Sequence, residues 1–290
     1  MSIAILISVH DGIVLAADSA STLALTQPAG PPSGPNSVVL SVYNNANKIA
    51  NLRKGSPIGC VAFGAGSIGS ASISTLLKDF RQKITDCQDA GFDIGTYTME
   101  SVAKLLTDFL MDHIAQLPGG VPKPSLGILL GGYSAGKNLG EGWKIQIDNG
   151  SAKPAVPLRK EDEIGISWGG EGESINRLIL GLSPHLPQAL CSVITPPPPQ
   201  PELDRLVAHL QRALQAPLVF APMPIQDTID LAEFLVHTAI MFSRFTPGAP
   251  SVGGPIEIAA ITKHEGFKWI RRKHYYSKEL NPDLRHGDSD

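Results

Sequence analysis

Short runs of apolar residues open the chain and predict β-strands. Residues 2–9 and 13–18 are two such runs, separated by a His-Asp-Gly turn at 10–12. An Asp-Gly pair between two apolar, β-rich runs is a strong signal for a β-hairpin. Further strands are predicted at 38–43, 48–52, 58–63, 126–133, 143–148, 154–158, 164–168, 256–262 and 268–270.

Apolar residues at intervals of three and four predict helices between these strands. The helical segments are 73–84, 102–114, 173–182, 202–214 and 226–242. Strands and helices thus come in blocks rather than in alternation, which favours antiparallel sheets with segregated helices over a parallel βαβ sheet. We expect an α+β fold, a four-layer αββα sandwich of two antiparallel sheets flanked by helices.

The same pattern predicts one domain over residues 1–276, followed by a polar tail at 277–290. Two segments look like insertions, near 25–37 and 183–201. The first is rich in Pro, Gly and Ser, and the second contains four consecutive prolines, which force an extended stretch.

Composition and charge narrow the class of protein. Hydrophobic residues make up 42% of the chain and the net charge is -3, so we expect a globular protein without a nucleic-acid surface. The short basic segment 268–273 is interpreted as a solvated strand end. The apolar start is too short for a signal peptide or a membrane helix, which predicts a cytoplasmic protein that does not bind a membrane. Three scattered cysteines give neither a disulfide framework nor a metal-ligand spacing.

Two glycine clusters follow predicted strands. The first, at 64–69, reads GAGSIG and superficially matches the dinucleotide-binding pattern G-x-G-x-x-G. That motif normally opens a parallel βαβ unit, whereas here five strands precede the cluster and two helices follow it. The second, at 169–172, is either a turn that frames a site or a plain loop.

Ser2 is the strongest candidate for chemistry. Removal of Met1 would make it the first residue, and an α-amine with a pKa near 8 can then take the proton of the adjacent hydroxyl. Such a nucleophile also needs a buried cation, a carboxylate that pairs with it, and backbone N–H groups for the oxyanion. Lys48, Asp18 and Gly64 are the candidates for these roles.

The segments HDGIVLAADSAST, NKIANL and IGCVAFGAGSIG resemble the N-terminal half of a proteasome β-type subunit, with the bacterial ancestral-β kind as the nearest match. Counting back from Asp18 without a gap places the family's first mature residue on Ser2. The segment SVGGPIEIAAI at 251–261 resembles a later strand of the family.

The resemblance implies an N-terminal nucleophile hydrolase that acts on peptides or proteins and assembles into homo-oligomeric rings or spirals. It implies no metal or organic cofactor. Ser2, Asp18, Lys48 and Gly64 would be catalytic. The walls of the specificity pocket would be Ala46, Ala50 and Ala62.

The sequence departs from the family pattern in two places. Ser19 and Ala20 stand where the family has an arginine after the aspartate, and Ala249 and Val252 stand where it has an Asp and a Ser that support the amine. Two alternatives therefore stay open: a non-catalytic, self-assembling scaffold subunit of the same fold, and an acylase for small amides.

Overall fold

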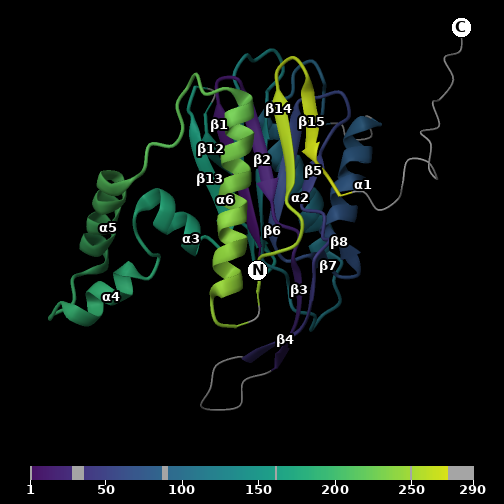
Figure 1. Cartoon of the computed structure of the whole chain (residues 1–290). Coiled ribbons are helices and arrows are strands. Elements are labelled where there is room, and N and C mark those ends of the chain that lie inside the picture. The colour runs from purple at the N-terminus through teal and green to yellow at the C-terminus, as the bar shows by residue number, and fades with distance from the viewer. Residues whose placement is uncertain (1, 28–35, 87–90, 161, 249, 274–290) are drawn as a thin grey trace, which may run out of the picture.

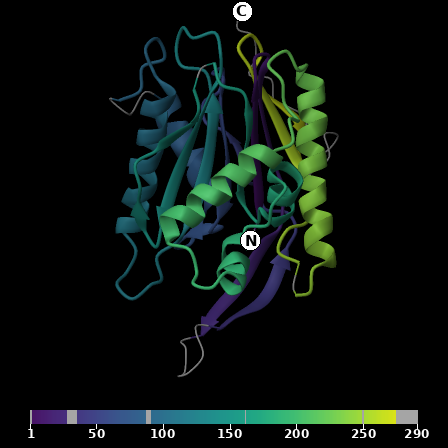
Figure 2. The same ribbon diagram turned by 90° about the vertical axis from the view of Figure 1, so that its left-hand side faces the viewer.

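The computed structural model describes residues 2–27, 36–86, 91–160, 162–248 and 250–273. The expected tail at 277–290 lies outside these residues, as do Ala249 and the middle of the segment 25–37. Two β-sheets lie face to face, and helices cover their outer faces (Figures 1 and 2). The predicted α+β, four-layer αββα sandwich is confirmed.

The first sheet is antiparallel throughout and begins with the predicted hairpin. Its strand order is β13-β1-β2-β14-β15, and Val9 pairs with Gly12 at the tip of the hairpin. The strands are β1 (Ile3–Val9), β2 (Gly12–Ala17), β13 (Gly165–Gly170), β14 (Glu257–Thr262) and β15 (Gly266–Arg271).

The second sheet is also antiparallel and contains six strands, in the order β11-β10-β9-β6-β5 with β12 paired to β10. Its strands are β5 (Ile49–Asn51), β6 (Ile58–Gly64), β9 (Leu126–Gly132), β10 (Glu141–Asp148), β11 (Ser151–Ala152) and β12 (Val156–Arg159). Two small separate ladders join β3 (Ser21–Gln27) to β4 (Asn36–Tyr43) and β7 (Ser67–Ile68) to β8 (Ala71–Ser72).

Helices form the outer layers. α1 (Ile73–Thr85) and α2 (Met99–Ala115) cover the second sheet, and α6 (Ile225–Phe245) covers the first. Short α3 (Glu173–Ile175) continues as a π-helical turn, η1 (Asn176–Leu180), beside α6. None of the described helices is long and apolar enough to cross a membrane.

Three apolar clusters fill the three spaces between the four layers. Strand β1 shows why: Ile3, Ile5 and Ile7 pack toward α6, whereas Ala4 and Leu6 pack toward the second sheet. Successive side chains of a strand point to opposite faces, so a strand in the middle of four layers is apolar at every position. This burial fixes the position of Ser2 at the start of β1.

The structure corrects three local predictions. The segment 183–201, expected to be an extended loop, contains helix α4 (Leu186–Val193) before its prolines, and α5 (Gln200–Leu214) follows. The helix expected over 173–182 ends in the π-helical turn at Gly181, whose φ is +71°. β3 has no counterpart among the predicted strands. The β3–β4 hairpin projects from one end of the molecule (Figure 1).

Candidate active site

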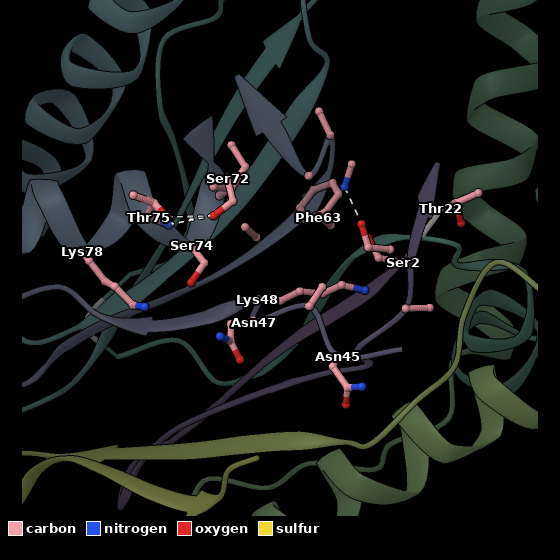
Figure 3. A pocket seen from close by; sticks show the side chains of 18 residues that line it. Ser2, Thr22, Asn45, Asn47, Lys48, Phe63, Ser72, Ser74, Thr75 and Lys78 are labelled. Atoms are coloured by element: carbon pink, nitrogen blue, oxygen red, sulfur yellow. Dashed lines mark hydrogen bonds between the residues drawn. The ribbon is translucent and has the colours of Figure 1, made fainter. Parts of the chain in front are cut away.

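Ser2 lies at the start of β1, opposite the end of β6. It is only 3% exposed, and its Oγ accepts a hydrogen bond from the N–H of Gly64 over 3.3 Å (Figure 3). Gly64 has a φ of +90°, and a Cβ there would lie 2.8 Å from the carbonyl oxygen of Ser125. The backbone conformation that turns this N–H toward Ser2 therefore favours glycine.

The main chain on either side of the Ser2 side chain is held by hydrogen bonds. The Ser2 carbonyl accepts from the N–H of Glu171 over 2.7 Å, and the N–H of Ile3 donates to Asp18 Oδ1 over 3.0 Å. Gly170 comes so close that a Cβ there would lie 1.8 Å from the Ser2 carbonyl oxygen. The second glycine cluster, at 169–172, is therefore the end of strand β13 and the bend that follows it, which lie beside Ser2, rather than a plain loop.

Asp18 follows β2 and is fully buried. Its Oδ1 lies 2.5 Å from the Lys48 Nζ, and its Oδ2 accepts the N–H groups of Ala20 and Gly253, each over 3.0 Å. With the bond from Ile3, four donors surround one carboxylate, which compensates for its removal from water.

Lys48 lies just before β5, and its ammonium points toward Ser2 in Figure 3. Burial lowers the pKa of Lys48 from its ordinary value, and the Asp18 carboxylate opposes this shift. The structure thus brings the four predicted residues Ser2, Asp18, Lys48 and Gly64 together from four separate segments.

A second buried ion pair lies beside the first, and sequence analysis did not find it. Lys273 Nζ lies 3.5 Å from Glu257 Oε2 and donates to Ser19 Oγ and to the Ala46 carbonyl oxygen. Glu257 Oε2 also accepts the backbone N–H of Lys48 over 3.3 Å. The expectation that 268–273 is a solvated strand end is wrong for Lys273, whose side chain is 7% exposed.

A cavity of about 450 Å³ opens beside Ser2, between β6 and α1 (Figure 3). Of the three predicted pocket walls, Ala46 and Ala62 line this cavity. Ala50 instead lines a neighbouring hollow of about 60 Å³. Ala50 is two residues beyond Lys48 along the chain, or about 7 Å in extended backbone, and so lies past the cavity.

The segment at 251–253 supports the site through its backbone. The N–H groups of Ser251 and Val252 both donate to Ser243 Oγ on α6, and the N–H of Gly253 donates to Asp18. Val252 is buried and has no polar side-chain atom, and Ala249 is not among the described residues. Through its N–H groups this segment holds Asp18 and α6, and Val252 cannot supply the side-chain support of the α-amine that the family pattern places there.

No family model matches the sequence, and a search of curated proteins finds no match. Among solved structures, the chain is similar to an Anbu (Gly-1) mutant from Hyphomicrobium sp. strain MC1, with 15% identity and a TM-score of 0.52 over 94% of this chain and 86% of that one. It is also similar to Anbu (ancestral beta-subunit) from Yersinia bercovieri, with 15% identity and a TM-score of 0.50 over 94% of this chain and 88% of that one. At this identity the likeness shows a shared, proteasome-like fold.

Proposed function

We propose that this protein is an amide-bond hydrolase, a peptidase by preference, in which Ser2 becomes the N-terminal nucleophile after removal of Met1. The observation that carries the proposal is the position of the Ser2 hydroxyl, which accepts the Gly64 N–H while Asp18 holds both the neighbouring N–H of Ile3 and the ammonium of Lys48. A serine that is only the second residue of a chain would not require this hydrogen bond from Gly64 or a buried ion pair beside it.

In the proposed reaction the free α-amine of Ser2 takes the proton of its own hydroxyl. Oγ then attacks the carbonyl carbon, and the resulting oxyanion is stabilised by the N–H of Gly64. Collapse of this intermediate breaks the C–N bond, and the amine returns the proton to the leaving nitrogen. Water hydrolyses the Ser2 ester by the same steps and restores the free hydroxyl.

Lys48 and Asp18 have electrostatic roles in this scheme. A cation near the α-amine lowers the pKa of that amine, so more of it is neutral and able to act as a base. Asp18 pairs with Lys48 and, through the N–H of Ile3, fixes the strand that carries the nucleophile. Neither group needs to exchange a proton with the substrate.

The proposal is tested by intact-mass analysis followed by labelling with a β-lactone or an epoxyketone. We expect a mass that lacks Met1 and a single adduct, which Ser2→Ala abolishes. Thr22→Ala is the matched control, because Thr22 also lines the cavity but its Oγ1 is buried, so this variant should label like the wild type. Retention of Met1, or an adduct that persists in Ser2→Ala, would overturn the proposal.

The same experiment distinguishes the two alternatives. A chain that lacks Met1 but does not label would favour the scaffold function, which the apolar Val252 side chain also favours. A chain that labels but cleaves only short acyl amides, and no peptide, would favour the acylase.

We further propose that the chain associates with itself. Several large apolar side chains stay exposed on the projecting β3–β4 hairpin and near α4 and α5, where a monomer gains nothing from them. They are Leu23, Val39, Leu40, Tyr43, Val193, Leu206 and Leu214. Light scattering on the full chain tests this proposal, and a single species of about 30.8 kDa would contradict it.

A further inference from the structure

The cavity beside Ser2 is polar, and none of the described residues that line it has a negatively charged side chain. Eighteen of the described residues line it, and among them only Lys48 and Lys78 have charged side chains. Most of the others are Ser, Thr, Asn, Ala or Gly. Asp18 already pairs with Lys48, so Lys78 supplies the cavity's uncompensated charge.

Lys78 comes from α1, on the side of the cavity away from Ser2, and its ammonium points inward in Figure 3. The side chain is exposed, and among the described residues no carboxylate forms an ion pair with it. An ammonium at the wall of a cavity, with no partner of its own, attracts an anionic group that enters the cavity.

The neighbouring hollow extends this positive charge. It shares Asn47, Ser74 and Lys78 with the cavity and adds Arg81 and Arg272. Lys78 and Arg81 are three residues apart on α1 and therefore lie on the same face of the helix. Among the described residues that line the hollow, the one carboxylate is that of Glu257, which is buried and held by Lys273 and by the N–H of Lys48. Among the described lining residues, a carboxylate of the substrate would therefore meet cations and no unpaired anion.

We propose that the Lys78 end of this cavity binds an acidic side chain, so that the preferred substrates are amides whose acyl portion carries a carboxylate, such as the bond after Glu in a peptide. The cleavage part of this statement rests on the proposed function of Ser2. The binding part does not, because it depends only on the cavity and its charge.

Binding is measured first, on the full-length Ser2→Ala variant, so that no chemistry is required. The probes are fluorescein-labelled tripeptide acids that differ only in a C-terminal Glu, Gln or Lys, and the readout is fluorescence anisotropy. We expect Glu to bind about fivefold more tightly than Gln, the upper end of what an exposed ion pair contributes. The preference should fall at 0.5 M salt, where screening is stronger.

Charge variants show whether Lys78 is the cause. Lys78→Met should remove the preference for Glu over Gln, and Lys78→Glu should make the Lys peptide the tightest of the three. Lys54→Glu is the matched control, because Lys54 is an exposed lysine in the turn after β5 and lines neither hollow. A preference for Glu that survives Lys78→Glu, or no preference in the Ser2→Ala protein, would overturn the proposal.

Hydrolysis of the matching peptide amides by the protein with Ser2 intact is measured second. Cleavage after Glu at about five times the kcat/KM of cleavage after Gln supports both proposals. Selective binding of the Glu peptide without cleavage of any peptide overturns the proposed function and leaves the acidic subsite standing. Cleavage without preference for Glu overturns the subsite and leaves Ser2 as the nucleophile.

Discussion

The ammonium of Lys273 lies 3.5 Å from the carboxylate of Glu257, and both side chains are buried next to the Asp18–Lys48 pair. The two pairs are linked directly, because Glu257 Oε2 also accepts the backbone N–H of Lys48. Lys273 in turn holds the Ala46 carbonyl in the loop that leads to Lys48. Lys273, two residues after the end of β15, thus supports the cation beside the first strand.

Replacement of Lys273 by methionine should destabilise the fold. The variant leaves the Glu257 carboxylate buried without its cation and removes two hydrogen bonds, so we expect the free energy of unfolding to fall by roughly 2–4 kcal/mol. Urea unfolding measures this loss. Lys268→Met is the control, because Lys268 is exposed on β15, and it should change the stability by less than about 0.5 kcal/mol. Equal stabilities for the two variants would show that the Lys273–Glu257 pair contributes nothing to the free energy of unfolding.

The same variant should raise the pKa of Lys48. Burial is the main cause that lowers this pKa, and the positive charge of Lys273 lowers it further, whereas Asp18 and Glu257 raise it. Lys273→Met removes the repulsion and leaves the attraction of Glu257 uncompensated, so both changes act in the same direction. NMR titration of the lysine Nζ resonances measures the effect. An unchanged or lower pKa for Lys48 would contradict the proposed coupling of the two pairs.

Stability should depend on pH through Lys48. Its pKa is lower in the folded chain than in the unfolded chain, where it is near 10.5. Between these two values the unfolded chain binds more protons, so the contribution of Lys48 to the free energy of unfolding rises with pH. The difference in stability between the wild type and Lys48→Met should therefore grow from pH 7 toward pH 10.

Urea unfolding of both proteins across this range tests the sign. Burial raises the pKa values of three other groups: Cys60, Tyr97 and Tyr133. These groups are present in both proteins, so their contributions to the pH dependence of stability largely cancel in the difference. A flat or falling difference would show that the pKa of Lys48 is not lowered in the folded state.

The position of Asp18 beside the first strand could be predicted because local patterns determine it. The Asp-Gly turn fixes the register of β1 on β2, with Ala4 opposite Ala17, and this register places Asp18 beside Ile3. The ionised side chain of Asp18 directly follows a wholly apolar strand, so burial with a partner is the expected outcome. These relationships span fewer than twenty residues.

Lys273 could not be predicted in this way, because its partner depends on tertiary packing. It lies 225 residues after Lys48 along the chain, in a segment whose other basic residues, Lys268, Arg271 and Arg272, are exposed. The one available signal is Glu257, a single carboxylate in the apolar run PIEIAAI, because a buried charge requires a partner. The sequence does not say which of several cations fills that role.

Helix α4 could not be predicted from the sequence, for a different physical reason. Its residues have no buried side chain, so no burial imposes a regular apolar spacing, and the four prolines that follow dominate the local pattern. Ala50 was expected in the wall of the cavity but lines the neighbouring hollow. A count along the chain does not show where α1 closes the cavity. The position of Ala50 depends on the packing of distant segments.

Gly64 and Gly55 allow the oxyanion role to be separated from simple backbone strain. Both have positive φ, +90° and +77°, so alanine costs each about 1–2 kcal/mol from conformation alone. A Cβ at Gly55 meets nothing within 4 Å, whereas a Cβ at Gly64 would lie 2.8 Å from the backbone oxygen of Ser125. Only Gly64→Ala must therefore shift the end of β6 and its N–H away from Ser2.

We expect Gly64→Ala to slow labelling of Ser2 by a β-lactone about 100-fold, the lower end of the loss seen when one oxyanion donor is removed. Gly55→Ala should label at the wild-type rate, despite a similar conformational cost to its stability. Rates are measured by intact mass on samples shown by circular dichroism to be folded. If Gly64→Ala labels as fast as Gly55→Ala, the N–H of Gly64 is not the oxyanion donor and its contact with Ser2 Oγ is structural only.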